Sequence, residues 1–267
     1  MRLEKLKHII DNSENIVFLG GAGVSTESNI PDFRSNNGLY KSKNNLNYSP
    51  ETILSHNFFK NNTKEFFQFY KDKMIFKDAK PNLAHYALTE LEQIGKLKAI
   101  ITQNIDGLHQ LSGAKNVLEL HGSVHRNYCV NCGEKYNLDY ILNTENSSED
   151  IPHCKKCGSI VRPDVVLYEE GLDMDTINKA VYYIQNADVL IVGGTSLVVY
   201  PAAGLVNYYK GKKLVLINKA ETPYDKKADL VIHDSIGSVL EKVIKKKLIK
   251  FLVSFLILIL TSFKFLI

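Results

Sequence analysis

All four cysteines of this 267-residue chain lie close together, as two Cys-x2-Cys pairs. Cys129 and Cys132 form the first pair, Cys154 and Cys157 form the second, and 21 residues separate them. This spacing is typical of a zinc ribbon, in which four thiolates hold one Zn2+ tetrahedrally. Because four thiolates leave no position for water, the spacing predicts a structural zinc. The N-terminus lacks an export signal, which favours a metal site over disulfides.

A histidine follows the short run 117–120, which we expect to be a strand. His121 stands there beside Gly122. Imidazole titrates near neutral pH, so a histidine at a strand end could act as a general base. An isolated histidine is more often structural and hydrogen-bonded to backbone, so this interpretation depends on the neighbouring motifs.

Three polar side chains follow the apolar run 97–102, within Thr102-Gln103-Asn104-Ile105-Asp106. The carboxyl end of a strand is where a binding site is expected in an α/β sheet. The alternative is a helix cap, because asparagine and aspartate both cap well. A cap needs one such residue, whereas this segment offers three.

A glycine-rich segment follows the apolar run 16–19 and reads Gly20-Gly21-Ala22-Gly23-Val24-Ser25-Thr26. Glycines let the backbone approach a pyrophosphate, and the N-terminus of a following helix attracts its charge. The fingerprint G-x-G-x-x-G is incomplete, because Thr26 occupies the place of the third glycine. Taken alone, the segment fits a nucleotide site and a plain tight turn equally well.

Two further segments carry polar groups that a nucleotide could use. Ile30-Pro31-Asp32-Phe33-Arg34 offers an aromatic face and a fixed cation, although it could also be a plain surface loop. Small hydroxyls occur in Gly193-Gly194-Thr195-Ser196-Leu197, and Asn218 follows another apolar run. These groups suit ribose and adenine contacts, with a tight turn and a helix cap as alternatives.

The segments between these motifs predict a doubly wound α/β sheet. Short apolar runs typical of buried parallel strands alternate with helix-like segments. The expected strands cover residues 16–19, 97–102, 117–120, 189–192 and 214–217, and the expected helices cover 3–10, 82–94 and 175–185. Residues 35–79 and 124–164 interrupt this alternation, and we expect them to form a small second domain. The large domain would then comprise residues 1–34, 80–123 and 165–247.

The composition is that of an ordinary soluble globular protein, with 45% hydrophobic and 23% charged residues. The formal net charge is +4, but residues 240–267 hold six lysines and one glutamate. The rest of the chain is therefore close to neutral, which argues against a nucleic-acid partner. With no export signal, we expect a cytoplasmic protein.

Taken together, these motifs resemble the sirtuin family. The matching segments occur in the family's order and spacing, from about residue 5 to residue 245. They are Gly21-Ala22-Gly23-Val24-Ser25, Ile30-Pro31-Asp32-Phe33-Arg34, Thr102-Gln103-Asn104-Ile105-Asp106, Leu120-His121-Gly122, the two cysteine pairs, Val161-x-Pro163, Gly194-Thr195-Ser196-Leu197 and Pro201-Ala202. The resemblance implies a Rossmann-like large domain and a small domain of zinc ribbon and helical module. NAD and an acyl-lysine peptide would enter the cleft between the domains from opposite sides.

The resemblance also implies an activity, the NAD-dependent removal of acetyl groups from lysines of acetylated proteins or peptides. In the family, the acyl oxygen attacks C1′ of the nicotinamide ribose. The products are free lysine, nicotinamide and O-acyl-ADP-ribose. His121 would be the general base, with Asn104 as a second catalytic residue.

Further residue roles follow from the same resemblance. The pyrophosphate of NAD would be held by Ala22, Thr26 and Arg34, and the nicotinamide would be surrounded by Phe33, Ile105 and Asp106. The adjacent ribose would lie near Gln103 and Asn104. The adenosine half would lie near Thr195, Ser196, Asn218 and Ile236. Gly23, Gly194 and His121 would also lie against the cofactor. Val165 and Tyr168 would contact the peptide.

Two departures from the family pattern affect the substrate. The substrate strand often reads Val-x-Phe-Gly-Glu, whereas Tyr168 and Glu169 stand here in the Phe and Gly places. Members that remove acidic acyl groups carry Tyr-x-x-Arg, but here Tyr70 is followed by Lys73. Lysine lacks the bidentate fork that grips a carboxylate, so we expect acetyl to be preferred to succinyl.

Two other functions stay open as alternatives. One is mono-ADP-ribosyl transfer, in which the same bond is cleaved and a protein accepts the ADP-ribose. The other is a non-catalytic NAD-binding module that uses its zinc ribbon for protein contacts. A change at His121 or Asn104 would favour the module, and both residues are intact.

An apolar tail, residues 248–267, follows the matching segments. Its uncharged stretch, residues 251–263, has 13 residues, fewer than the roughly 18 expected of a membrane-spanning helix. A membrane anchor, a helix packed on the body and an accidental extension are all consistent with it. Membrane association is expected only through this tail, and the lysines at 245–247 would suit an anionic surface.

Overall fold

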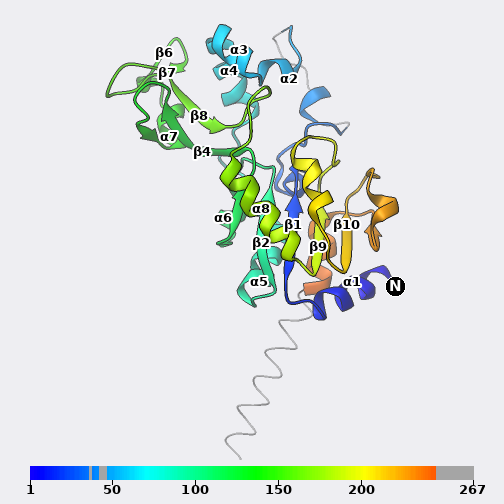
Figure 1. Ribbon diagram of the computed structural model, residues 1–267. Coiled ribbons are helices and arrows are strands. Elements are labelled where there is room, and N and C mark those ends of the chain that lie inside the picture. Colours follow the sequence, from blue (N-terminus) through cyan, green and yellow to red (C-terminus); the bar gives the residue numbers. More distant parts are fainter. Residues whose placement is uncertain (36–37, 42–46, 245–267) are drawn as a thin grey trace, which may run out of the picture.

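The computed structural model describes residues 1–35, 38–41 and 47–244. Its central sheet has six parallel strands in the order β11-β10-β9-β1-β2-β3 (Figure 1). The strands are β1 (Ile16–Gly20), β2 (Leu97–Thr102), β3 (Val117–Glu119), β9 (Val189–Gly193), β10 (Lys213–Ile217) and β11 (Leu230–Ile232). The chain winds outward from β1 in one direction and then from β9 in the other, an order typical of dinucleotide-binding sheets. The predicted doubly wound sheet is confirmed.

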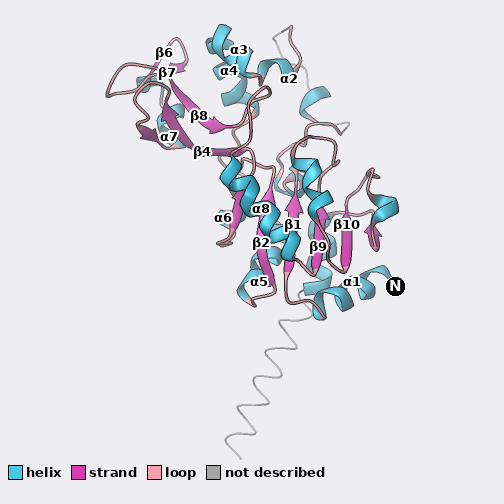
Figure 2. Ribbon diagram, viewed as in Figure 1, coloured by secondary structure: helices cyan, strands magenta, loops and turns pink. Residues whose placement is uncertain are grey.

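Alternate residues of each buried strand point to opposite faces of the sheet, so each strand supplies two cores. In β1, Ile16 and Phe18 join one cluster, whereas Val17 and Leu19 join the other. Helices α1 (Arg2–Asp11) and α5 (Leu83–Gln93) cover the first face, together with the helical residues 236–244. Helix α8 (Met174–Asn186) and the 3-10 helix η5 (Ala202–Tyr208) cover the second, nearer the viewer in Figure 2.

A separate group of short elements lies beyond the carboxyl ends of the sheet strands, at the top of Figure 1. Three short helices come from the first interruption: α2 (Pro50–Ile53), α3 (His56–Asn61) and α4 (Thr63–Lys73). The second interruption contributes β4 (Gly122–Cys129), β5 (Lys135–Tyr136), α7 (Leu138–Leu142), β6 (Ser147–Ser148), β7 (Ile151–Pro152) and β8 (Val161–Val165). Strands β5, β4 and β8 form an antiparallel sheet.

One apolar cluster joins these two interruptions. Phe59 and Phe66 of the short helices pack there in the same cluster as Cys129, Cys154 and Val161 of the cysteine-containing segment. Neither segment holds enough apolar side chains for a core of its own, so burial depends on their contact. That the two segments form a separate small domain stays a prediction.

The tail prediction concerns residues outside the described part of the chain. Within residues 1–35, 38–41 and 47–244, none of the helices has the length and apolar character needed to cross a membrane.

Candidate active site and zinc centre

Two glycine-rich loops meet where neighbouring strands end. Gly20 of β1 is in register with Gly193 of β9, so the chain leaves both strands at the same edge of the sheet. Beyond that edge, the Gly23 N–H donates to the Gly194 oxygen at 2.8 Å. A Cβ on Gly23 would lie 2.8 Å from the Gly194 Cα, and Gly194 itself has φ of +59°. Glycine is needed at both positions because backbone touches backbone.

The segment after β1 differs from the expected helix start. It forms two 3-10 turns, η1 (Ala22–Val24) and η2 (Thr26–Ser28), in place of an α-helix. The expectation that an α-helix N-terminus follows the glycines and attracts a pyrophosphate is therefore wrong at this position. Thr26 Oγ1 donates to the Gly23 oxygen at 2.9 Å, so the residue in the third glycine's place closes the loop.

A cavity of about 1160 Å³ opens at this edge of the sheet. Ligand pockets usually measure roughly 300–1,000 Å³, so this one has room for two substrates. The cavity is lined by every residue predicted to contact NAD or the peptide: Ala22, Gly23, Thr26, Phe33, Arg34, Gln103, Asn104, Ile105, Asp106, His121, Val165, Tyr168, Gly194, Thr195, Ser196, Asn218 and Ile236. The structure thus brings all of them together, while their individual roles stay predictions.

His121 is held by one backbone contact. Its Nδ1 lies 2.9 Å from the Gln103 oxygen. Since a carbonyl only accepts, Nδ1 carries the proton and donates it there, which leaves Nε2 as the basic nitrogen. Burial lowers the pKa of His121, against the smaller opposing effect of this hydrogen bond. The imidazole is therefore neutral at pH 7 and able to accept a proton.

The polar segment after β2 is fixed by a residue that the sequence did not single out. Ser25 Oγ donates to Asp106 Oδ2 at 2.6 Å and accepts from Asn104 Nδ2 at 3.0 Å. The other Asp106 oxygen accepts from the Leu108 N–H at 2.9 Å. Asp106 therefore bonds the Leu108 N–H, at the start of a short helix, and lines the cavity as well. Ser25 lies inside a motif that was noted for its glycines, and its hydroxyl was the available signal.

The segment containing Phe33 and Arg34 folds back on itself. Asp32 Oδ1 accepts the backbone N–H groups of Arg34 and Ser35 at 3.0 and 2.7 Å. The Tyr40 N–H donates to the Phe33 oxygen at 3.0 Å. This turn places Phe33, Arg34 and Tyr40 on the cavity wall. Tyr40 is a cavity residue that sequence reasoning missed, because no motif contains it.

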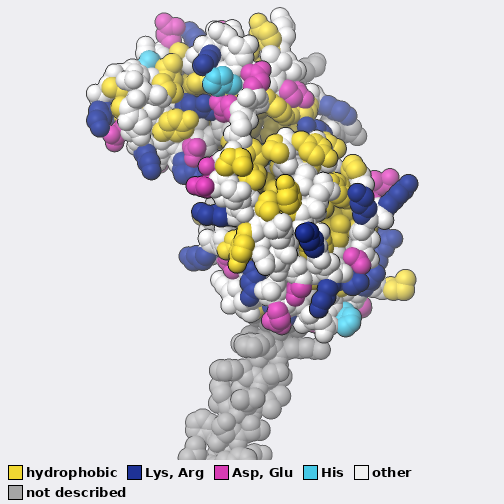
Figure 3. All heavy atoms as spheres, viewed as in Figure 1, with side chains coloured by type: hydrophobic (Ala, Val, Ile, Leu, Met, Phe, Trp, Pro, Cys, Tyr) yellow, Lys and Arg dark blue, Asp and Glu magenta, His cyan; other side chains and the backbone are white. Residues whose placement is uncertain are grey.

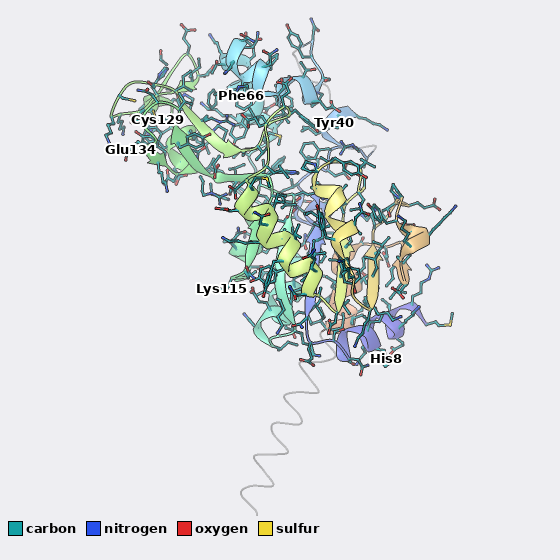
Figure 4. All side chains as sticks on the ribbon, in the orientation of Figure 1. His8, Tyr40, Phe66, Lys115, Cys129 and Glu134 are labelled. Carbon is teal, nitrogen blue, oxygen red and sulfur yellow. The ribbon has the colours of Figure 1, made fainter. Side chains whose placement is uncertain are left out.

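The four cysteines converge as the ribbon spacing predicts. Their Sγ atoms all lie within 4.8 Å of one another, and three of the pairs are 3.4–3.6 Å apart. A tetrahedral zinc with Zn–S bonds of about 2.3 Å needs sulfur atoms about 3.8 Å apart. None of the four forms a disulfide. The thiolate set therefore fits one zinc ion, in the region of Cys129 labelled in Figure 4.

A model of the Sir2 family matches residues 21–201, which include both glycine loops, His121 and all four cysteines. The chain belongs to the Sir2 family. It is 67% identical over 243 residues to an NAD-dependent protein deacetylase of Clostridium tetani (strain Massachusetts / E88), an alignment that covers 91% of this chain and 97% of that protein. A deacetylase of Clostridium perfringens (strain 13 / Type A) is 63% identical, with 91% and 98% covered.

Solved Sir2 structures share the fold. Sir2 in complex with a peptide and NAD+ gives a TM-score of 0.82 at 40% identity, covering 93% of this chain and 100% of that chain. Sir2 bound to an acetylated peptide gives 0.81 at 38% identity, covering 92% and 99%. The predicted sirtuin resemblance and Rossmann-like fold are confirmed.

The segment expected to contact the peptide has an unusual backbone conformation at Glu169, which stands in the place of the family's glycine. Glu169 has φ of +74°, a left-handed conformation that suits glycine and costs other residues roughly 1–2 kcal/mol. Its carboxylate accepts the Asn57 N–H at 3.0 Å, at the start of α3. That bond at a helix N-terminus offsets part of the strain. The glutamate therefore adopts a backbone conformation that glycine would adopt without strain.

An ion pair anchors the same segment. Arg162 donates to both Glu170 carboxylate oxygens at 2.7 and 3.0 Å, and His56 Nδ1 lies 2.7 Å from Glu170 Oε1. Burial opposes ionisation of Glu170, but hydrogen bonds from Arg162, the Leu167 N–H and His56 outweigh it and lower the pKa to about 2. The pair ties the helices to β8, and sequence reasoning did not reveal it.

Two buried histidines pack between α5 and α6 (Leu108–Leu111). The ring centroids of His85 and His109 are 4.7 Å apart. His85 Nε2 and both His109 nitrogens have no hydrogen-bond partner in the described part of the chain. Burial lowers the pKa of His85 to about 4 and that of His109 well below its ordinary value. Both side chains are therefore neutral in the folded protein.

This pair predicts that mild acid destabilises the fold. Below pH 6.5 the unfolded chain binds protons that the folded chain excludes, so the free energy of unfolding falls as the pH drops toward 4. From His85 alone we expect a loss of about 2 kcal/mol between pH 7.5 and pH 5. Urea unfolding at the two pH values measures it. His109→Leu should reduce the difference in the free energy of unfolding between the two pH values, whereas the exposed control His8→Gln should leave it unchanged. If the wild type and His109→Leu show the same difference, the buried histidines are not its cause.

Proposed function

We propose that this chain is an NAD-dependent protein-lysine deacetylase that acts on acetylated proteins. The observation that carries this function is His121, a neutral imidazole of fixed tautomer on the wall of a cavity large enough for two substrates. The Clostridium relatives are named NAD-dependent protein deacetylases, and the alignments cover nearly their full length.

The cavity residues fit NAD. A cation on Arg34, hydroxyls on Thr195 and Ser196 and an amide on Asn218 face the same cavity as His121. They match the anionic phosphates and the hydroxyl-rich riboses of a dinucleotide. When bound, NAD supplies a nicotinamide leaving group and an ADP-ribosyl acceptor for the acyl group.

The chain's own groups divide the remaining work. His121 Nε2 takes a proton from a ribose hydroxyl, and the Gln103 carbonyl keeps the imidazole in the tautomer that can do so. Ser25 holds Asn104 and Asp106 at fixed positions on the wall of the same cavity. These bonds order the side chains before substrates bind, so the free energy of ordering them is not lost during the reaction.

A division of labour between two domains accompanies this function. The large domain, residues 1–34, 80–123 and 165–247, would bind NAD. The small domain, residues 35–79 and 124–164, would carry the structural zinc and help to hold the peptide. Support comes from the apolar cluster shared by the two interruptions and from the anchoring of residues 165–170 against α3.

The prediction that the protein has no nucleic-acid partner rests on its charge. Lysine and arginine side chains intermingle with acidic ones on the face seen in Figure 3, without a continuous basic surface there. The face in view therefore offers no broad basic surface for a nucleic acid, and the absence of such a partner stays a prediction. A cytoplasmic location, and membrane association through residues 248–267 alone, stay predictions.

The test of the function is mass spectrometry of an acetyl-lysine peptide incubated with the protein, with and without NAD. Loss of 42 Da, about the mass of one acetyl group exchanged for hydrogen, is expected only with NAD, together with O-acetyl-ADP-ribose. Transfer of ADP-ribose to protein in place of deacetylation would favour the transferase alternative. Binding of NAD with no product would favour the non-catalytic module.

The acyl preference of the enzyme can be predicted from two side chains. Tyr70 is buried on the cavity wall, and its hydroxyl has no partner within the described residues. Lys73 also lines the cavity, but its Nζ lies 2.9 Å from Asp72 Oδ2. Because an acidic neighbour already pairs with this lysine, it is poorly placed to bind a second carboxylate.

We therefore expect a higher kcat/KM for acetyl than for succinyl peptides. Lys73→Arg should raise succinyl kcat/KM about 5-fold, the effect of roughly 1 kcal/mol from one added hydrogen bond. Asp72→Asn should act in the same direction by releasing Lys73. Side-by-side kinetics on matched peptides give the answer, and a wild-type enzyme that prefers succinyl would overturn this view of the pocket.

A further inference from the structure

Two tyrosines join the segments that are expected to bind the two substrates. The hydroxyls of Tyr40 and Tyr168 are hydrogen-bonded to each other across 128 positions of sequence, and both residues line the cavity. Tyr40 lies in η3 (Leu39–Lys41), just after the segment of Phe33 and Arg34. In Figure 4 it stands between the short helices and the strand ends of the large sheet.

On one side, Tyr40 is in direct contact with the expected cofactor residues. Its N–H donates to the Phe33 oxygen at 3.0 Å, and the two rings meet edge to face with centroids 5.6 Å apart. The Arg34 guanidinium lies over the Tyr40 ring, 5.2 Å from its centroid. Edge-to-face and cation–π contacts of this kind fix relative orientation. The position of Tyr40 therefore helps to set those of Phe33 and Arg34.

On the other side, the backbone of Tyr168 is held in place. Its N–H donates to the Leu54 oxygen and its carbonyl accepts the His56 N–H, each at 3.0 Å. These bonds hold its backbone against α2 and α3, next to the segment expected to pair with the peptide. The family pattern has phenylalanine at this place, and phenylalanine has no hydroxyl to offer. The bond to Tyr40 therefore depends on the tyrosine that this chain carries at position 168.

We propose that Tyr40 and Tyr168 are a positioning pair that couples NAD binding to acyl-peptide binding. The proposal rests on the proposed function. Peptide binding beside Tyr168 restrains its side chain, which favours the arrangement of Tyr40 that holds Phe33 and Arg34 over the cofactor. Because coupling between sites is reciprocal, bound NAD strengthens peptide binding by the same factor. Neither hydroxyl takes part in the chemistry.

The experiment measures that coupling directly in the full chain. Calorimetry gives the affinity for carba-NAD, a non-hydrolysable analogue, with and without a saturating acetyl-lysine peptide. We expect the peptide to tighten carba-NAD binding in the wild type. In Tyr168→Phe and in Tyr40→Phe this tightening should fall about 3- to 5-fold, as expected for the loss of one hydrogen bond between neutral groups. The double variant should lose no more than either single one.

Two further readouts separate positioning from a general structural effect. In steady-state kinetics, the single variants should raise the KM for NAD at saturating peptide while kcat stays within about twofold. Tyr182→Phe, at an exposed tyrosine of α8, is the matched control and should change neither quantity.

The failure of this proposal is distinguishable from failure of the function. A wild type that neither binds carba-NAD nor deacetylates contradicts the function itself. If the wild type does both, unchanged coupling in the tyrosine variants overturns the positioning pair. Additive losses in the double variant would overturn it too, because they would mean that the two hydroxyls act independently.

Discussion

Replacing His121 with alanine is expected to lower kcat by about 100-fold or more, the usual contribution of a general base. Among the described residues, the His121 side chain makes one hydrogen bond, from Nδ1, and its backbone bond to Val166 would remain in the variant, so the fold should stay intact. Deacetylation of a peptide, with urea unfolding as the check on folding, measures both effects. The remote, exposed His8→Ala serves as the control and should keep wild-type turnover.

The pH profile gives an independent readout of the same residue. A base works only when unprotonated, so activity should be lost as the pH falls through the pKa of His121. Burial lowers that pKa below the ordinary 6.5, and the acidic limb of kcat/KM in the free enzyme should therefore have its midpoint below 6.5. A His121→Ala variant that retains more than about a tenth of wild-type turnover would exclude the general-base role.

Removal of the zinc should have the second large effect, and it should act through the fold. Elemental analysis of fresh protein should give one zinc per chain. Cys129→Ala removes one of four ligands and opens a core position, since Cys129 is only 1% exposed within the shared apolar cluster. We expect zinc to be lost, the small domain to become sensitive to protease within residues 124–164, and activity to fall indirectly.

A graded control lies beside the thiolates. The Tyr136 hydroxyl is 3.1 Å from Cys154 Sγ and also accepts the Lys155 N–H at 3.1 Å. Tyr136→Phe removes this bond but keeps all four ligands, so it should retain one zinc per chain. Active, freshly purified wild-type protein that contains no zinc would contradict the structural role of the metal.

The apolar runs in the sequence predicted the longer strands of the sheet but not its shortest elements. The apolar runs predicted β1, β2, β9 and β10 to within a residue or two, because strands buried on both faces must be apolar throughout. Strand β11 has only three residues, too few to show a pattern. The 3-10 turns after β1 escaped notice too, because local spacing does not distinguish them from the first turn of an α-helix.

The site was predictable where a strand end supplied the clue. His121, the Gln103–Asp106 segment and the cysteines each stand at a recognisable position in the sequence. Ser25 and the Arg162–Glu170 pair do not, because their importance comes from partners 81 and 8 residues away. Tyr40 is similar, since its partner Tyr168 is 128 residues distant. Such contacts depend on the assembled fold and leave no local pattern.

The shared apolar cluster has a consequence for the synthesis of the chain. Helices α3 and α4 bury Phe58, Phe59, Phe66 and Phe67 against residues that the ribosome makes roughly 90 positions later, as far as Leu167. Because synthesis adds roughly 5–20 residues per second, about 5–20 s pass before the later residues of this cluster are made. During this interval the nascent chain exposes four phenylalanines within ten residues, a segment suited to capture by a chaperone. This apolar cluster is therefore completed only after Leu167 has left the ribosome.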